Sequence, residues 1–270
     1  NLTGYVVASD VDSDNITYTY NWYKNGTLNA TSLITDGLVA YYPLNNDTLD
    51  YYGSNDGTNN GAVRDTISYA MGGSYIFDGS GDYIQSSVGL SSNPMTISFW
   101  MNLETAEGQD IMFMDKDAFN GGEGIEIFSW DGGTDLGIRG SSSTVVTTST
   151  VVAGKWTHIV AVFENTTGTI YIDGSYDTSG AITQVSTSSH PMLIGIYGDE
   201  TSYGFNGYMD EVLIFNRSLN STEISQLYWA GVAKGHTMNS SQTTVGDNWT
   251  LGVRGLDYSD IGSEINSSGL

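Results

Sequence analysis

The sequence contains no cysteine, only three prolines and three histidines, and only eight basic residues among its 270. Without cysteine the chain cannot form disulfides, use a thiolate nucleophile or bind zinc through sulfur. The histidines, His158, His190 and His236, lie far apart in sequence, which disfavours a histidine metal centre. No run of eighteen apolar residues is present, so no segment predicts a membrane-spanning helix.

Positive charge is scarce. Eight Lys and Arg residues against 31 Asp and Glu residues give a formal net charge of -23. A surface of this sign repels phosphate backbones and anionic membranes, so nucleic acid is excluded as an expected partner. An acidic surface suits cations, high-salt solvent or solubility, and solubility is the interpretation that we favour.

The residues that are abundant indicate strands. Short alternating runs of Thr, Val, Ile and Tyr are broken by 34 glycines and many Asn, Asp and Ser residues, and this pattern predicts an all-β protein. With 39% hydrophobic and 12% aromatic residues, the chain can bury a sizeable core. Its length allows one large or two modest domains.

Asparagine occurs unusually often in the acceptor context of N-glycosylation. Eleven of the twenty asparagines begin Asn-X-Ser/Thr, where the Ser and Thr content would give roughly four or five by chance. An Asn- and Thr-rich β protein can contain unused acceptors; the other interpretation is a glycosylated protein, which predicts an extracellular or cell-surface location. The predicted acceptors are Asn1, Asn15, Asn25, Asn29, Asn46, Asn165, Asn216, Asn220, Asn239, Asn248 and Asn266.

The long middle of the chain has one organisation, carried by six segments. In order they are "GLVAYYPLNNDTLDYYGSNDGT", "GGSYIFDGSGDYIQ", "MTISFWMNL", "GKWTHIVAVFENTTGTIYIDG", "MLIGIYGD" and "FNGYMDEVLIFNRSLNSTEISQLYWAG". Together they resemble the laminin-G-like, concanavalin A-like lectin/glucanase jelly roll. The resemblance implies a jelly-roll sandwich over residues 36–235.

The local patterns agree with such a sandwich. In "MTISFWMNL" the apolar residues alternate along a strand that has two usable faces. Two strands around the Asn-Thr-Thr-Gly turn predict a hairpin, and Asp173-Gly174 begins the next turn. The segment "NSTEISQLYW" predicts one helix, in which Asn220 and Glu223 form a capping box. We expect this helix to pack against the end of the sandwich.

Catalysis is not expected. Glucanases of this superfamily carry paired carboxylates on one strand, which requires even spacing because side chains alternate along a strand. In "GEGIEIF" Glu123 and Glu126 are three positions apart, and in "MDEVLIF" Asp210 and Glu211 are adjacent. The spacing places the members of each pair on opposite faces, so the chain is predicted not to be an enzyme.

The resemblance also implies calcium. In laminin-G-like jelly rolls one cation commonly joins an early loop to the last long strand through oxygen ligands. The matching residues here are Asp50 and Asn55 in the loop and Asp210 on the strand. The alternative is that Asp50 and Asn55 shape a turn and Asp210 caps a bulge. Asp78 and Asp82 are interpreted as turn residues.

Sugar binding would need an aromatic platform. Trp130, Tyr197 and Tyr203 are the candidates, because each lies in a segment rich in Gly and Asp. Trp100 and Trp156 lie on predicted strands and are interpreted as core residues. A scaffold role is the alternative for every one of these aromatic residues, since the fold does not imply a ligand.

The two ends of the chain have features of a single domain. "LTGYVVASDVDSDNITYTYNWYKNGT" and "TTVGDNWTLGVRGLDYSD" resemble parts of one immunoglobulin-like repeat of large prokaryotic, archaeal surface proteins. The resemblance implies one split domain, residues 1–35 and 236–270, with the jelly roll inserted into it. Trp22 and Trp249 should then face each other across one small core. The acidic loops at one pole form either an acidic tip or a second candidate calcium site, with Asp10, Asp12, Asp14, Asp257 and Asp260.

Such a repeat usually begins with one more strand. We therefore expect an open sheet edge that a neighbouring repeat or subunit fills by strand addition. The main hypothesis is a non-enzymatic structural or adhesive surface protein, a subunit or repeat of a filament or cell-surface assembly. The alternative is a carbohydrate-binding, lectin-like module that attaches to external polysaccharide.

Overall fold

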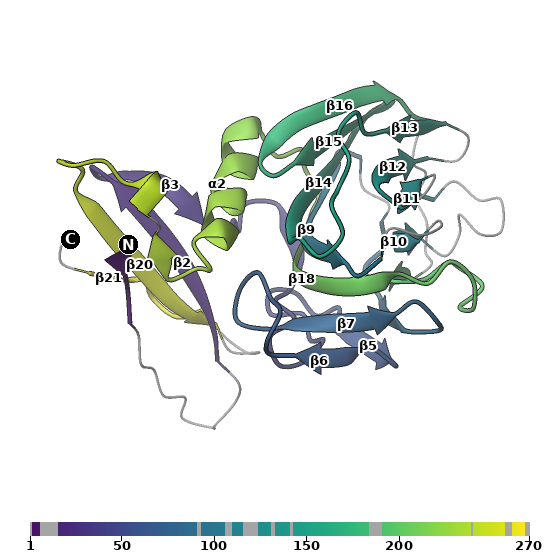
Figure 1. Ribbon diagram of the computed structural model, residues 1–270, viewed down its shortest axis with the longest axis horizontal. Coiled ribbons are helices and arrows are strands. Elements are labelled where there is room, and N and C mark those ends of the chain that lie inside the picture. Colours follow the sequence, from purple (N-terminus) through teal and green to yellow (C-terminus); the bar gives the residue numbers. More distant parts are fainter. Residues whose placement is uncertain are drawn as a thin grey trace.

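The computed structural model describes residues 2–5, 16–90, 93–105, 110–115, 124–130, 133–140, 143–183, 191–238, 240–256 and 261–267. Two β bodies of unequal size lie side by side, and the helix α2 (Ser221–Val232) lies between them (Figure 1). Nearly all of the regular structure is strand, which confirms the all-β prediction. Within the described residues, no helix is long and apolar enough to cross a membrane.

The larger body is a sandwich of two antiparallel sheets. The first sheet has seven strands in one path and β4 paired beside them: β16 (Ser175–Ala181), β15 (Thr167–Ile172), β14 (Thr157–Glu164), β9 (Met95–Leu103), β18 (Asn206–Phe215), β7 (Ser74–Asp78) and β6 (Val63–Asp65), with β4 (Leu38–Tyr42) on β18. The second sheet has seven strands in the order β13 (Thr144–Val146), β12 (Asp135–Arg139), β11 (Glu126–Trp130), β10 (Ile111–Asp115), β17 (Met192–Ile194), β8 (Tyr83–Ser86) and β5 (Gly57–Asn60).

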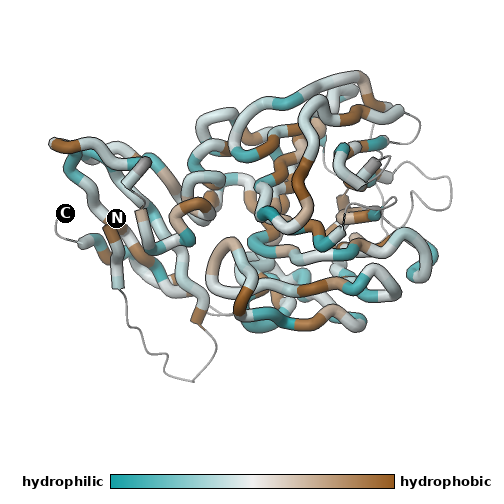
Figure 2. The backbone as a smooth tube through the Cα atoms, in the orientation of Figure 1, coloured by the Kyte–Doolittle hydropathy of each residue, from teal (hydrophilic) through white to brown (hydrophobic). Residues whose placement is uncertain are grey.

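Strand β9 shows why the first sheet is covered on both sides. Ile97 and Phe99 face the second sheet, where the Phe99 ring lies 4.5 Å from the ring of Phe113. Each such buried side chain contributes about 1.5–3 kcal/mol to the hydrophobic stabilisation. Thr96 and Ser98 face the opposite way, toward the layer that contains α2, and all nine residues of the strand are buried. In Figure 2 hydrophobic and hydrophilic residues are interspersed through both bodies.

The predicted hairpins are present. Strands β14 and β15 pair antiparallel from Glu164 opposite Thr167, and the turn residue Asn165 has a φ of 54°. Asp173 and Gly174, with φ values of 49° and 75°, connect β15 to β16. Asparagine, aspartate and glycine adopt positive φ at low cost, so the Asn-Thr and Asp-Gly dipeptides determine both turns.

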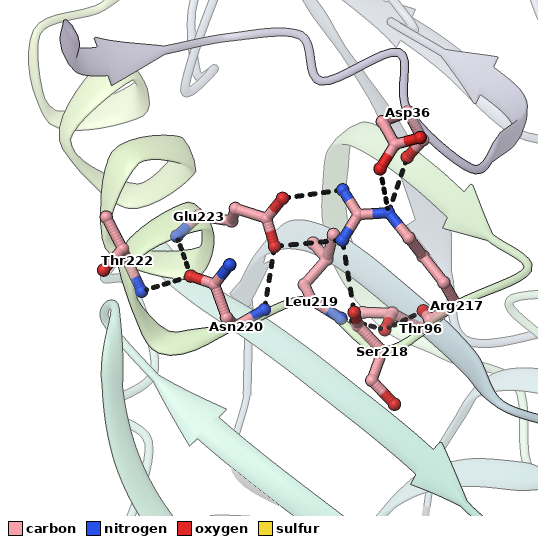
Figure 3. Close-up of polar contacts among 8 residues, drawn as sticks. All are labelled: Asp36, Thr96, Arg217, Ser218, Leu219, Asn220, Thr222 and Glu223. Atoms are coloured by element: carbon pink, nitrogen blue, oxygen red, sulfur yellow. Dashed lines mark hydrogen bonds and ion pairs between the residues drawn. The ribbon is translucent and has the colours of Figure 1, made fainter.

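Helix α2 begins with the predicted capping box. The Asn220 side chain accepts hydrogen bonds from the backbone amides of Thr222 and Glu223, and the Glu223 carboxylate accepts one from the Asn220 amide (Figure 3). Arg217 pairs with Glu223 at 2.7 Å and with Asp36 at 3.1 Å, which ties the helix start to the chain entering the sandwich. The helix covers a face of the first sheet and not the end of the sandwich, so our expectation for its packing was wrong.

The smaller body contains both ends of the chain. Its sheet has the order β21 (Ile265–Asn266), β20 (Trp249–Leu256), β2 (Thr17–Lys24) and β3 (Thr27–Thr31). A separate pair joins β1 (Leu2–Thr3) to β19 (Thr237–Met238), and a short 3-10 helix, η1, spans Ser240–Gln242. Strands from residues 17–31 and 249–266 therefore form one sheet, although the whole sandwich lies between them in sequence.

Trp22 and Trp249 share one small core, as predicted from the sequence. Their ring centroids are 6.4 Å apart in an edge-to-face arrangement, and the Trp22 indole donates a hydrogen bond to the Gly235 carbonyl at 2.8 Å. The two tryptophans lie on neighbouring strands of a single sheet and do not face each other across two sheets. Ala230 of α2 also belongs to this core, while Ile224 and Leu227 of the same helix pack on the first sheet of the sandwich. The helix therefore packs on both bodies.

Candidate functional site

A cavity of about 240 Å³ opens where α2 meets the first sheet, and aromatic side chains line it. Trp100 comes from β9, Trp156 precedes β14, Tyr228 lies on α2, and Tyr69 lies in the loop between β6 and β7. Three charged side chains, from Lys155, Asp173 and Lys234, complete the wall. We call this cavity the aromatic pocket.

Trp100 forms the floor of the aromatic pocket. Its ring stacks on the Tyr228 ring at 5.8 Å with an interplanar angle of 12°, and the His158 ring lies 5.1 Å away on the same strand pair. The stack depends on Gly231, because a Cβ atom at that position would lie 2.2 Å from the Trp100 ring. A glycine inside the helix thus allows α2 to approach the sheet closely enough to form the stack.

Trp156 and Tyr69 form the outer walls. The Trp156 indole donates a hydrogen bond to the Ser68 hydroxyl at 3.2 Å, and its ring lies 6.3 Å from the ring of Tyr208. The Lys234 ammonium lies 4.9 Å from the centre of the Tyr69 ring, a cation–π distance. Trp156, Tyr69 and Tyr228 are half-buried, so each keeps part of its ring accessible.

The polar edge of the pocket is an ion pair. Lys155 donates to Asp173 at 2.9 Å, and this hydrogen bond raises the pKa of Lys155. The second Asp173 oxygen accepts from the His158 amide at 3.0 Å, so the carboxylate is held in one orientation. Aromatic walls with a few fixed polar groups suit a small ligand that presents both an apolar face and hydroxyl groups.

A second cavity, of about 260 Å³, lies beside the aromatic pocket. Tyr20 of β2 and His236 contribute to its wall from the smaller body, and Asn45 and Glu211 contribute from the sandwich. Tyr69 and Lys234 line both cavities. The second cavity is therefore formed between the two bodies and borders the aromatic pocket.

Asp210 and Glu211 lie on the same side of β18, because the strand bulges between Asp210 and Leu213. Asp210 pairs with Trp100 and Leu213 with Ser98, and Glu211, with a φ of 52°, lies beside Ser98 and Trp100 in a small gap under the pocket. Our expectation that the two carboxylates point to opposite faces was wrong, since strict alternation does not hold through a bulge.

Both carboxyl groups are buried, and burial raises the pKa of each. The pKa of Glu211 rises to about 8, although a hydrogen bond of 2.7 Å from the Tyr41 hydroxyl opposes the rise. The pKa of Asp210 rises well above its usual range, first by burial and then by the charge of Glu211. One Asp210 oxygen accepts from the Ala70 and Met71 amides, which positions the loop that carries Tyr69.

The candidate calcium residues bind two different loops: Asp50 and Asn55 interact within one loop, and Asp210 of β18 interacts with another. Asp50 accepts hydrogen bonds from the amides of Tyr41, Tyr52 and Gly53 and from Asn55, so Asp50 and Asn55 do come together. Asp210 instead binds the loop before β7. Within the part of the chain that the structure describes, no three His, Cys, Asp or Glu side chains form a group that could hold a metal ion. Calcium binding stays a prediction. Asp10, Asp12, Asp14, Asp257 and Asp260 lie outside the described residues.

Two of the predicted sugar-binding aromatics do meet. The rings of Tyr197 and Tyr203 lie 5.5 Å apart, edge to face, in the loop between β17 and β18, and Tyr203 is 53% exposed. Trp130 is the last residue of β11 and pairs with Asp135, but its side chain lies outside the described ones. The Tyr pair lies apart from the two cavities described above, whose walls other residues form.

Four residues of the pocket were not predicted from the sequence as site residues: Tyr69, Lys155, Tyr228 and Lys234. Trp100 and Trp156 were predicted to be core residues. Trp100 is indeed almost buried, at 5% exposure, yet its ring is the pocket floor. No spacing pattern links these residues, because they come from a loop, two strand regions and the end of a helix.

Most predicted glycosylation acceptors lie on the surface. Asn29 and Asn46 are half-buried, and Asn1, Asn15 and Asn239 lie outside the described residues. Glycosylation itself stays a prediction. The exposed acceptors are Asn25, Asn165, Asn216, Asn220, Asn248 and Asn266.

Comparison with known proteins gives a family match. A family model named Laminin_G_3, described as the concanavalin A-like lectin/glucanases superfamily, matches residues 78–225, which is more than half of the chain. A search among curated proteins found no match.

Several solved structures share the fold. Domain 4 of AbnA, a GH43 extracellular arabinanase from Geobacillus stearothermophilus, in complex with arabinotriose, is 24% identical with a TM-score of 0.60, over 71% of this chain and 98% of that one. A Trypanosoma rangeli sialidase complex is 18% identical with a TM-score of 0.60, over 87% of this chain and 37% of that one. The botulinum neurotoxin serotype D ligand binding domain in complex with N-acetylneuraminic acid is 14% identical with a TM-score of 0.56, over 72% of this chain and 50% of that one.

These comparisons correct the main functional hypothesis. The prediction of a filament or surface-assembly subunit is wrong, since the similar structures belong to an arabinanase, a sialidase and a neurotoxin, and all three are complexes with a sugar or a sugar derivative. They favour the alternative that the sequence also allowed. At these identities they show the fold, and the chain spans only about a third to a half of the sialidase and toxin chains.

Proposed function

Since this chain belongs to the concanavalin A-like lectin/glucanase superfamily, we propose that it is an extracellular carbohydrate-binding module that holds a sugar in the aromatic pocket. The observation that carries the proposal is the convergence of Tyr69, Trp100, Trp156 and Tyr228 on one cavity from four separate parts of the chain. Aromatic rings provide a large rigid surface for the apolar face of a sugar ring at low entropic cost.

The polar groups of the pocket support the same ligand class. The Lys155–Asp173 pair lies at the pocket edge with both side chains held in place, where it can exchange hydrogen bonds with sugar hydroxyl groups. Charged hydrogen-bonding groups that are already oriented bind hydroxyl groups without a further ordering cost. The similar arabinanase domain was solved with arabinotriose, which adds support at the level of the fold.

We propose binding without catalysis. The Asp173 carboxylate is paired with Lys155, and Asp210 and Glu211 lie buried beneath the pocket, with Asp210 bonded to backbone amides. None of these groups presents a free carboxylate to a sugar held in the aromatic pocket. Release of a shortened product from an oligosaccharide incubated with the purified chain would contradict this part of the proposal.

The proposal also covers the smaller body, the self-association of the chain and its location. We assign the sheet built by the two chain ends to a split immunoglobulin-like domain, residues 1–35 and 236–270, of a prokaryotic, archaeal protein. Strand addition at the β21 edge of that sheet would provide self-association, and sedimentation of the purified chain over a range of concentrations tests it. A carbohydrate-binding module of this kind would act outside the cell.

The test of the binding site compares two single substitutions. We expect the chain to bind at least one polysaccharide in a glycan array, and Trp156→Ala to weaken that binding by roughly two- to tenfold, because one aromatic contact is worth roughly 0.5–1.5 kcal/mol. Tyr203→Ala is the matched control, since it removes an exposed aromatic from the other candidate site. Loss of binding in Tyr203→Ala with full binding in Trp156→Ala would reject the aromatic pocket and favour the Tyr197–Tyr203 pair.

A further inference from the structure

We propose that the aromatic pocket and the second cavity are neighbouring subsites of one groove, and that Lys234 between them selects oligosaccharides that contain an acidic sugar residue. The inference rests on the proposed carbohydrate-binding function and specifies its ligand class. It is supported by the shared walls of the cavities, by the Lys234 ammonium, which has no carboxylate partner among the described residues, and by the local charge of the second cavity.

The two cavities are continuous in their walls. Tyr69 and Lys234 line both, so a ligand that leaves one cavity past these side chains enters the other. The volumes are about 240 and about 260 Å³. Each alone is smaller than the roughly 300–1,000 Å³ typical of small-molecule sites, whereas the two together fall within that range. A ligand longer than a single sugar fits this arrangement best.

Lys234 differs from the other basic residues in its surroundings. Among the described residues, Lys24, Arg139, Lys155, Arg217 and Arg254 each pair with a carboxylate, and Arg64 donates hydrogen bonds to the Asn45 carbonyl and the Asn46 side chain. Lys234 has no carboxylate partner in the described part of the chain, although acidic residues outnumber basic ones by 31 to 8. Its ammonium lies 4.9 Å from the centre of the Tyr69 ring.

The backbone holds Lys234 at the mouth of both cavities. The Gly235 amide donates to the Ala230 carbonyl and the Lys234 amide to the Gly231 carbonyl, which is a Schellman ending for α2. Lys234 occupies the left-handed position of that motif, with a φ of 46°, where glycine is the usual residue. The negative end of the helix dipole favours a cation there, so the ammonium can stay without a carboxylate partner until a ligand supplies one.

The second cavity accepts an anion despite the net charge of the molecule. Its one carboxyl group, Glu211, has a pKa of about 8 because it is buried, so it is mostly neutral at pH 7. The remaining polar lining includes Asn45 and His236, which can donate hydrogen bonds. A sugar carboxylate in this cavity would meet the Lys234 ammonium, while the one carboxyl group in the lining of the cavity is mostly neutral.

The experiment is calorimetric titration of the full chain with paired probes: trigalacturonate and its carboxyl-reduced form, and 3′-sialyllactose and lactose. We expect at least one acidic probe to bind at least tenfold more tightly than its neutral counterpart, and added salt to reduce this preference. Lys234→Gln should abolish the preference. Lys24→Gln changes the net charge equally but lies in the smaller body beside Trp249, so it should retain the preference.

The outcomes separate the two proposals. Equal binding of acidic and neutral probes, unchanged in Lys234→Gln, would overturn the acidic-ligand inference and leave the binding function standing, whereas no binding by any sugar in the titrations and in the array would overturn both. His236→Ala tests the groove itself, because His236 lines only the second cavity. It should weaken the binding of trigalacturonate and leave unchanged the binding of a neutral monosaccharide such as galactose, which the aromatic pocket alone can hold; equal loss for both would contradict two subsites.

Discussion

Glu211 combines two unusual properties in one residue, a positive φ in the middle of a strand and a carboxyl group inside the protein. A non-glycine residue in this conformation costs about 1 kcal/mol or more, so the surrounding structure must hold it there. Its side chain meets the Tyr41 hydroxyl and lies beside both the second cavity and the gap below Trp100. Residues strained in this way occur preferentially at functional sites.

The pKa of Glu211 predicts how stability depends on pH. The ordinary value is 4.5 and the folded value is about 8, so the folded chain keeps a proton that the unfolded chain releases in between. The contribution of Glu211 is therefore complete below about pH 4.5 and is lost as the pH rises through about 8. Glu211→Gln should remove this loss, so that the stability difference between variant and wild type grows in favour of the variant from pH 5 to pH 8.

Urea unfolding of both proteins at pH 5, 6.5 and 8 measures that difference. The comparison cancels the general repulsion among the 31 acidic residues, which both proteins share almost equally. The effect of Asp210 also remains in both, since burial raises its pKa as well. Parallel pH profiles for the two proteins would mean that Glu211 is already ionised in the fold at pH 5.

Gly231 gives a second prediction about a single residue. Alanine is the better helix former by about 1 kcal/mol, but its Cβ atom would lie 2.2 Å from the Trp100 ring. The ring cannot move away freely because it packs against the rings of both His158 and Tyr228. Overpacking of this kind costs about 1–3 kcal/mol, so Gly231→Ala should lower the free energy of unfolding and weaken sugar binding.

Thermal unfolding and sugar titration of Gly231→Ala check this expectation, with Ser225→Ala in the same helix as the control. The control gains helix propensity without a comparable contact and should match or exceed the wild type in stability. If Gly231→Ala were as stable as Ser225→Ala and bound sugar fully, close approach of helix and sheet would not determine the pocket.

Helix α2 is the element on which the architecture depends, and its start can be tested alone. The Asn220 side chain satisfies two backbone amides, while Glu223 also binds Arg217 (Figure 3). Replacing an N-cap asparagine by alanine typically costs about 1 kcal/mol. Asn220→Ala should therefore lower the free energy of urea unfolding by about that amount, whereas Thr222→Ala, at an exposed position with no cap role for its side chain, should stay within about 0.5 kcal/mol. Equal effects would show that the capping box does not stabilise the helix.

Regular elements were predictable because their causes are local. The alternation in Met95–Leu103, the turn at Asp173-Gly174 and the box at Asn220 and Glu223 each depend on residues a few positions apart. The bulge at Glu211 was not predictable, because the pairing of β18 with β9 determines it. The pocket was not predictable for the same reason, since Tyr69 and Tyr228 meet only after α2 has docked on the sheet.

At the scale of the whole molecule, α2 joins the two bodies. Ala230 packs into the core around Trp22 and Trp249, while Ile224 and Leu227 pack on the first sheet of the sandwich. Tyr228 and Gly231, which lie on either side of Ala230 in the sequence, line the aromatic pocket. Because the same three turns of helix take part in both cores and in the site, we expect the smaller body, the sandwich and the pocket to unfold together.

Leu251→Ala tests this coupling from a position outside the cavities. Leu251 is 3% exposed in the smaller core, and its truncation should cost about 2–5 kcal/mol, whereas Val245→Ala, at a fully exposed residue, should cost less than about 0.5 kcal/mol. We expect one transition in urea, with coincident curves from tryptophan fluorescence and far-ultraviolet circular dichroism, and a midpoint shifted in Leu251→Ala.

A sugar that binds the pocket should raise the midpoint of both curves equally, since a ligand stabilises every part of the molecule that unfolds with its site. A separate early transition in Leu251→Ala, unaffected by sugar, would show instead that the smaller body folds independently of the pocket.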